Sequence, residues 1–194
     1  MRITKIKSIV LQKLANELPD KIRYHGISHT LDVLESCNAY IRRLKIAPKQ
    51  AYLLRTAAIL HDIGIIWDYT DHENRGIDFS RHVLPKLGYS PSDIDTICSM
   101  IQSTRLPQSP KTILEEILCD ADLDYLGTSK FYIIGNRLFE EFVNYKIVTD
   151  QESWDRVQVN FLRSHHYFTD FGKRVRQPVK QKYLNEILAK WGWE

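Results

Sequence analysis

The stretch AAILHDIGII, residues 57–66, places a histidine and an aspartate inside an otherwise apolar run. The run is predicted to be the end of a helix, because Gly64 follows where such a helix commonly stops. His61 and Asp62 each lie four residues after an alanine, so both side chains extend the apolar stripe and point inward. A carboxylate there loses its hydration and faces the partial negative charge of a helix C-terminus. A positive group is therefore expected to compensate Asp62.

Apolar residues recur with helical spacing along the rest of the chain, and no segment shows the alternation typical of a strand. Proline and glycine punctuate these periodic segments, and Ser28 is predicted to be the N-cap of the second one. The predicted helices cover approximately residues 3–18, 28–48, 49–63, 72–87, 92–104, 112–126, 129–146, 151–167 and 179–190. The fold class is therefore predicted to be all-α, with about eight or nine helices.

The length of 194 residues suffices for one compact domain with a substantial core. We predict a single domain over residues 1–194, with a motif-bearing core at about 20–130 and C-terminal helices at 129–190 packing on it. The net charge of +3 is too small to indicate a nucleic acid polymer as partner. No apolar segment approaches the roughly 20 residues that span a bilayer, so no membrane association is expected.

The cysteines indicate the redox environment of the protein. Cys37, Cys98 and Cys119 are odd in number and far apart, so they form neither a CxxC pair nor a disulfide framework. This usage is typical of a reducing compartment. Because the N-terminal segment also lacks the apolar region of a signal peptide, we expect a cytoplasmic protein.

Candidate metal ligands are concentrated in two regions. Five of the seven histidines lie between positions 25 and 82, and the stretch CDADLDYLG at 119–127 contains three aspartates. One divalent cation at the buried doublet would neutralise the carboxylate of Asp62 and accept the lone pair of His61. His29 and one aspartate of 119–127 could complete the set of donors. The competing interpretation is a hydrogen-bonded core pair of His61 and Asp62 without a metal ion.

Helical geometry does not decide which aspartate would be the ligand. Asp120 and Asp124 are four residues apart and share a face, whereas Asp122 points to the opposite side of the predicted helix. Asp124 lies nearer the centre of the apolar stripe, and Asp122 lies at its edge. The choice is therefore open at this point.

The ordered residues His29, His61-Asp62 and Asp122 resemble the H…HD…D signature of the HD superfamily of metal-dependent phosphohydrolases. The surrounding sequence is similar as well, in YHGISHTLDV (24–33), AAILHDIG (57–64), HE (72–73) and LCDADLDYLG (118–127). The resemblance implies that these four side chains hold a divalent metal ion. It alone selects Asp122, the aspartate that directly follows the alanine.

The same resemblance implies an activity. A metal-activated water would cleave a phosphate ester, expected to be that of a nucleotide or a related small phosphorylated metabolite. Phosphomonoesterase or nucleotidase activity is favoured over phosphodiesterase activity, because the chain lacks a GYP motif. Ile65 stands where many two-metal members have lysine, so one ion is expected. Mixed nitrogen and oxygen donors leave its identity open among manganese, iron, cobalt, nickel, magnesium and zinc.

Further site residues are inferred with competing structural interpretations. Asp62 and His72 are the catalytic candidates, with His72 as proton donor, phosphate contact or extra ligand. Glu73, Arg105 and Lys130 are candidates for substrate binding, although a helix-capping role for Glu73 and ordinary surface charge for the two cations would also explain them. A non-catalytic metal- or nucleotide-binding sensor, or a helical adaptor with a polar core network, is the alternative to an enzyme. A homodimer is left open.

Overall fold

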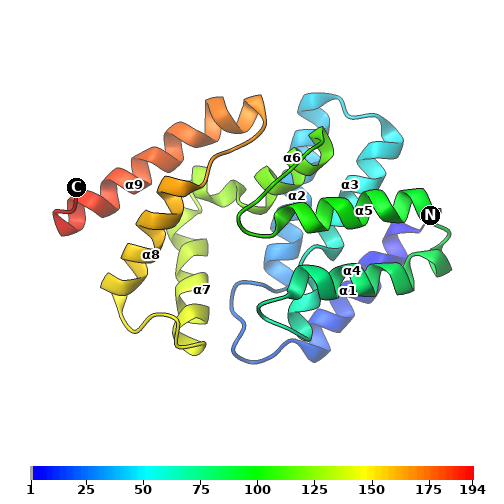
Figure 1. Ribbon diagram of the computed structural model, residues 1–194, viewed down its shortest axis with the longest axis horizontal. Coiled ribbons are helices and arrows are strands. Elements are labelled where there is room, and N and C mark those ends of the chain that lie inside the picture. The colour runs from blue at the N-terminus through cyan, green and yellow to red at the C-terminus, as the bar shows by residue number, and fades with distance from the viewer. Residues whose placement is uncertain (1) are drawn as a thin grey trace. The chain divides into compact units, whose positions relative to one another are not determined.

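The computed structural model describes residues 2–194, and this part of the chain is helical from end to end (Figure 1). The described residues form nine α-helices and four short 3-10 or π turns, and they contain no strand. The predicted all-α fold class is thereby confirmed. Among these helices, none combines the length and the apolar character that crossing a membrane requires.

The chain divides into two compact units. The first comprises the chain up to Asp20 together with His25–Asp122, and the second comprises Lys21–Tyr24 together with Leu123–Glu194. The single domain expected over residues 1–194 stays a prediction.

In the first unit, helix α3 is the central element. It packs on α1, α2, α5 and α6, and every residue from Thr56 to Leu60 is buried. Because the C-terminal part of α3 is buried on all sides, the residues that follow it begin in the interior. The elements of this unit are α1 (Ile3–Glu17), α2 (Ile27–Leu44), α3 (Pro48–Leu60), η1 (Ile63–Ile66), α4 (His72–Val83), η2 (Pro85–Leu87), α5 (Pro91–Thr104) and α6 (Ile113–Asp122).

The turn η1 packs tightly on α4 through Gly64. A Cβ atom at this position would lie 1.9 Å from the carbonyl oxygen of His72 and 2.6 Å from the backbone nitrogen of Gly76. No side chain fits so close to another backbone, which explains the glycine of the HDIG sequence. This approach brings the first residues of α4 beside the end of α3.

Several predicted helix boundaries were wrong. Helix α2 begins at Ile27 with Gly26 as its N-cap, so Ser28 lies inside the first turn. The backbone nitrogen and the hydroxyl of Thr30 both donate to the carbonyl of Gly26, at 3.0 and 3.1 Å, and the carbonyl at that position fixes the start of the helix. The predicted helix at 112–126 ends at Asp122, and a separate turn follows.

The second unit has its own apolar core, formed by Leu123, Leu126, Phe131, Val159, Leu162, Leu184 and Ile187. The buried carboxylate of Glu141 accepts hydrogen bonds from the backbone nitrogens of Arg23 and Tyr24, at 2.9 and 2.8 Å, and so anchors that short segment. The elements of this unit are η3 (Asp124–Gly127), α7 (Phe131–Asn144), α8 (Gln151–Ser164), η4 (Gly172–Arg176) and α9 (Gln177–Trp191).

Candidate metal centre

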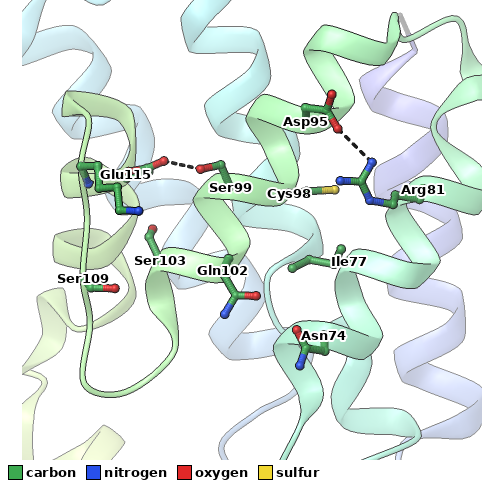
Figure 2. Close-up of a pocket in the computed structure, with 11 residues that line it drawn as sticks. Asn74, Ile77, Arg81, Asp95, Cys98, Ser99, Gln102, Ser103, Ser109 and Glu115 are labelled. Atoms are coloured by element: carbon green, nitrogen blue, oxygen red, sulfur yellow. Dashed lines mark hydrogen bonds and ion pairs between the residues drawn. The ribbon is translucent and has the colours of Figure 1, made fainter.

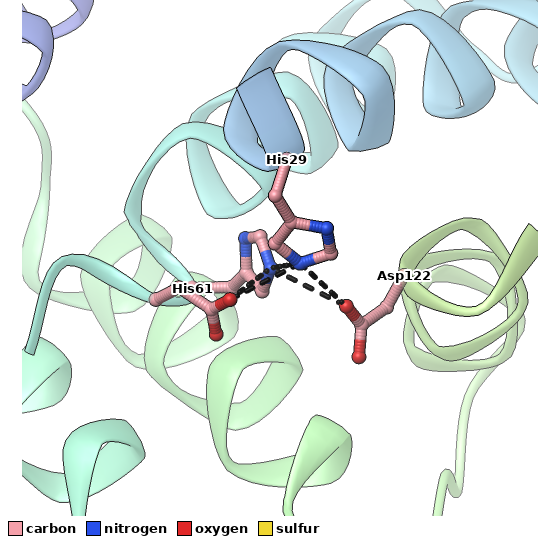
Figure 3. Close-up of side chains that lie close together, drawn as sticks. His29, His61 and Asp122 are labelled. Atoms are coloured by element: carbon pink, nitrogen blue, oxygen red, sulfur yellow. Dashed lines mark hydrogen bonds and ion pairs between the residues drawn. The ribbon is translucent and has the colours of Figure 1, made fainter. Parts of the chain in front are cut away.

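Four donor residues from three helix ends meet in the first unit. His29 lies in the first turn of α2, His61 is the C-cap of α3, Asp62 follows it, and Asp122 is the last residue of α6. Figure 3 shows the side chains of His29, His61 and Asp122 converging. One donor atom from each of the four residues lies within 4.8 Å of all the others. The structure therefore brings together the whole set of ligands inferred from the sequence.

The distances between these donor atoms are short. The Nε2 atom of His29 lies 3.1 Å from Nε2 of His61, 3.1 Å from Oδ2 of Asp62 and 3.1 Å from Oδ1 of Asp122. The Nε2 atom of His61 lies 3.2 Å from the same Asp62 oxygen and 3.4 Å from the same Asp122 oxygen. Ligands bound at about 2.1 Å are separated by about 3.0 Å at octahedral and about 3.4 Å at tetrahedral angles. The donor set therefore fits around one ion.

The backbone fixes the orientation of the His61 ring. Its Nδ1 atom lies 2.9 Å from the carbonyl oxygen of Ala58, which can only accept a hydrogen bond. In the neutral ring the proton is therefore on Nδ1, and the lone pair of Nε2 faces the centre of the cluster. Such a hydrogen bond from the other nitrogen is the usual support of a metal-bound histidine.

The cluster is buried, and its charges are strongly coupled. Asp62 is 6% exposed, and its Oδ2 atom accepts no well-formed hydrogen bond. Burial alone would raise the pKa of both carboxyl groups, but His61 and His29 lower the pKa of Asp62 well below its ordinary value and that of Asp122 to about 2. Both carboxylates are thus ionised, and an unsatisfied buried anionic oxygen is what a cation would neutralise.

The pKa values of the two imidazoles are raised, whereas those of the two carboxyl groups are lowered. Burial would lower the pKa of His61, but the charge of Asp62 and the hydrogen bond to Asp122 raise it well above the ordinary value. The pKa of His29 is also raised, since its close contacts with the carboxylates of Asp122 and Asp62 outweigh its burial. Protons and a metal ion therefore compete for the same nitrogen atoms.

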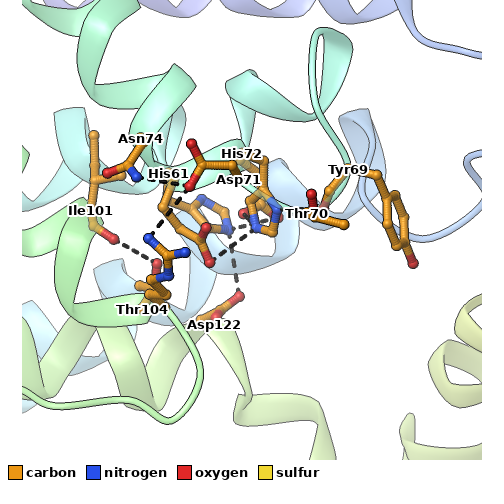
Figure 4. Close-up of polar contacts among 12 residues, drawn as sticks. His61, Tyr69, Thr70, Asp71, His72, Asn74, Ile101, Thr104 and Asp122 are labelled. Atoms are coloured by element: carbon orange, nitrogen blue, oxygen red, sulfur yellow. Dashed lines mark hydrogen bonds and ion pairs between the residues drawn. The ribbon is translucent and has the colours of Figure 1, made fainter.

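The first turn of α4 lies against Asp62, where Figure 4 shows His72 next to His61. The Nδ1 atom of His72 is 3.1 Å from the carbonyl oxygen of Tyr69, while its Nε2 atom is 3.6 Å from Oδ1 of Asp62 and 3.4 Å from Oε1 of Glu73. Glu73 is 6% exposed, and its Oε2 atom has no hydrogen-bond partner. Both residues lie at the donor cluster; their catalytic and substrate-binding roles stay predictions.

Arg105 contacts Asp71, the residue directly before His72, which sequence reasoning missed. Its Nη1 atom lies 3.4 Å from Oδ1 of Asp71, which also accepts a hydrogen bond of 2.8 Å from Asn74. Asp71 directly precedes His72 in the sequence. This position next to a candidate catalytic residue could have identified Asp71 as part of the site. Lys130 belongs to the second unit, where it is the N-cap of α7, and its substrate-binding role stays a prediction.

A separate cavity of about 430 Å³ lies between α4, α5 and the residues before α6 (Figure 2), and none of the four donors lines it. The side chains of Arg81, Asp95 and Glu115 in its lining are already paired with protein groups. Arg81 contacts Asp95 at 2.9 Å, and buried Glu115 accepts hydrogen bonds from the hydroxyl of Ser99 and the backbone nitrogen of Lys111, at 2.5 and 2.6 Å. We assign no role to this cavity.

Together, the helical fold and the histidine–aspartate cluster define an all-α domain with a candidate centre for a divalent metal ion. Residues 26–124, slightly more than half of the chain, match the HD domain family, so the protein belongs to that family. A comparison with curated proteins finds no match.

A solved structure supports the same fold. It is the 1.45 Å crystal structure of a predicted HD superfamily hydrolase from an uncultured Thermotogales bacterium, which is 23% identical to this chain with a TM-score of 0.63. The similarity covers 98% of this chain and 94% of the other. The family and the donor cluster together support a site for a divalent metal ion.

Proposed function

We propose that the protein hydrolyses a phosphate ester of a nucleotide or a related small phosphorylated metabolite. A single observation carries the proposal: two buried imidazoles and two carboxylates converge within 4.8 Å of one another at the ends of three helices. A divalent ion held there by His29, His61, Asp62 and Asp122 would activate a water molecule and offset the negative charge of the phosphoryl group.

The protein groups around the cluster suit the handling of a proton. With its Nδ1 atom directed at the Tyr69 carbonyl, His72 has Nε2 as the atom that can hold or release a proton beside Asp62. We assign to His72 the protonation of the leaving-group oxygen. Glu73 lies 3.4 Å from that nitrogen and restricts the ring to this position.

Recognition of the phosphate group falls to Arg105 in this proposal. Its side chain is 45% exposed and contacts Asp71 through one nitrogen, so other N–H groups are available to phosphate oxygens. Planar, multiply donating guanidinium groups suit phosphate. Glu73 and Lys130 remain candidates for contacts with the rest of the substrate, and a phosphomonoester is favoured over a diester.

The test is a phosphate-release screen on protein stripped with a chelator and reloaded with manganese, iron, cobalt, nickel, magnesium or zinc. The substrates are nucleotides, cyclic nucleotides and sugar phosphates. Metal-dependent release that Asp62→Asn abolishes and exposed Asp95→Asn does not is the expected result. Metal binding without turnover would favour the sensor, and protein that binds no metal would favour the adaptor; either result contradicts the proposal.

A further inference from the structure

The short turn after Asp122, residues 123–127, is held by residues near the C-terminus that are far away in sequence. The hydroxyl of Tyr167 donates a hydrogen bond of 3.1 Å to the carbonyl oxygen of Leu123, the residue directly after Asp122. Tyr167 is itself 1% exposed, so its ring is fixed by packing in the second unit. The backbone is thereby fixed one residue beyond a candidate metal ligand.

A second contact fixes the turn by charge. The guanidinium group of Arg176 donates from Nε to Oδ1 of Asp124 at 2.7 Å and from Nη2 to Oδ2 at 3.0 Å. The pair is largely buried, with side-chain exposures of 24% for Arg176 and 11% for Asp124. A bidentate pair of this kind restricts orientation as well as distance.

The third contact is steric. A Cβ atom at Gly127 would lie 2.6 Å from the Cβ atom and from the carbonyl oxygen of Arg176. The end of the turn therefore lies directly on the backbone of Arg176, where only glycine fits. Arg176 closes η4 immediately before α9, so it is itself anchored between two helical segments.

These contacts matter because Asp122 ends its helix. Leu123 has left helical geometry, with φ −106° and ψ 18°, so no further turn of α6 supports the aspartate from its C-terminal side. The backbone on the two sides of Asp122 therefore belongs to α6 and to the 123–127 turn. We propose that Arg176 and Tyr167 are positioning residues for Asp122, because they fix the turn that directly follows this aspartate and so support its carboxylate as a metal ligand. This inference rests on the proposed function, because it takes Asp122 to be a metal ligand.

The experiment measures Co²⁺ binding to the full-length, chelator-stripped protein by titration calorimetry and by the visible absorption of the bound ion. Supporting residues around metal ligands typically contribute 10- to 100-fold to affinity. For Arg176→Met we therefore expect Co²⁺ affinity to fall about 10-fold or more, with a changed visible spectrum. The matched control is Arg174→Met, because Arg174 donates from Nε to the carbonyl oxygen of Asp170, at 3.3 Å, within its own segment of the chain. It should keep both wild-type affinity and spectrum.

A double-mutant cycle separates positioning from general damage. If the Arg176–Asp124 pair acts as a unit, Asp124→Asn and Arg176→Met should weaken Co²⁺ binding by less together than the sum of their separate effects. If Arg176→Met does not fold, Arg176→Lys and Tyr167→Phe keep the charge and the ring respectively, and each should still weaken binding several-fold. Wild-type affinity and an unchanged spectrum in these folded variants would overturn the inference alone. Wild-type protein that binds no Co²⁺ would overturn the proposed function and this inference with it.

Discussion

The Nε2 atoms of His29 and His61 lie 3.1 Å apart, although His61 directs its only neutral-state proton from Nδ1 to the carbonyl of Ala58. The lone pair of His61 therefore faces a second imidazole and two carboxylate oxygens at the same point. A proton or a metal ion between these atoms would remove the repulsion between their lone pairs and negative charges. The site is thus expected to exchange protons for a metal ion.

Metal affinity should consequently rise with pH. In the metal-free protein the pKa of both His29 and His61 lies above the ordinary 6.5, so these nitrogens keep protons that an incoming ion must displace. Affinity should increase by up to about tenfold per pH unit for each proton released. Calorimetry with Mn²⁺ or Co²⁺ from pH 6 to 9 measures this slope, and a flat profile would contradict proton–metal competition.

Replacing Asp62 by asparagine should abolish both metal binding and hydrolysis while the helical content survives. The substitution keeps the shape of the side chain but removes the charge next to two imidazoles at 3.1 and 3.2 Å. Turnover should fall by at least about 10²-fold, since the proposed chemistry depends on the bound ion. Circular dichroism, metal analysis and phosphate release are measured on the same sample. Near wild-type turnover with the same metal requirement would refute the assignment.

His72→Gln should separate proton transfer from metal binding. His72 lies 3.6 Å from Asp62, beyond the four closely spaced donors, so the variant should retain the metal ion. Loss of a general acid lowers turnover by roughly 10²- to 10⁴-fold. Exposed His82, which contacts Lys86, offers the control His82→Gln. Loss of the metal ion from the His72 variant would instead make this histidine a ligand.

Much of the site could be predicted because its residues are close to sequence landmarks. A buried His-Asp doublet at the end of an apolar helix already required a positive charge, and family resemblance supplied His29 and Asp122. The helical wheel could not have chosen among the aspartates, because it assumed that the helix continued past residue 122. In the structure Asp124 lies on a separate turn and pairs with Arg176.

The parts that were missed depend on tertiary contacts between distant residues. Arg176 and Asp124 are separated by 52 positions, and no local pattern links them. The start of α2 was misplaced for a similar reason, since the carbonyl of Gly26, rather than the hydroxyl of Ser28, receives the bonds that begin the helix. Capping preference is a local rule, and here the backbone geometry outweighed it.

Gly64→Ala should destabilise the protein severely. Its Cβ would meet the backbone of α4 at 1.9 and 2.6 Å, and backbone atoms cannot turn aside as a side chain can. The loss should exceed about 3 kcal/mol, at the upper end of the range for overpacking. Gly135→Ala is the control, since its Cβ would approach only the Gln158 side chain, at 3.6 Å, within α7. It should stabilise by about 0.5–1 kcal/mol, and urea denaturation measures both. Equal effects of the two substitutions would contradict the close packing of η1 on α4.

The pH dependence of stability should reveal the buried ammonium group of Lys180. The side chain is fully buried in the second unit, where it bonds to the carbonyl oxygen of His165 and lies 3.3 Å from its Nδ1 atom. Burial lowers the pKa of Lys180 from 10.5 to about 8.

Below pH 8 the lysine is charged in the folded and unfolded states alike, and the full penalty of burying the charge opposes folding. Above it the folded protein releases the proton while the unfolded chain retains it up to about pH 10, so stability gains with pH. Relative to Lys180→Met, the wild-type free energy of unfolding should therefore rise by about 2 kcal/mol between about pH 8 and pH 10. Lys182→Met, at a position whose side chain is 72% exposed, should show no such trend. Urea titrations of the three proteins across this range supply the comparison. Parallel curves for wild type and Lys180→Met would mean that the amino group titrates as it does in water.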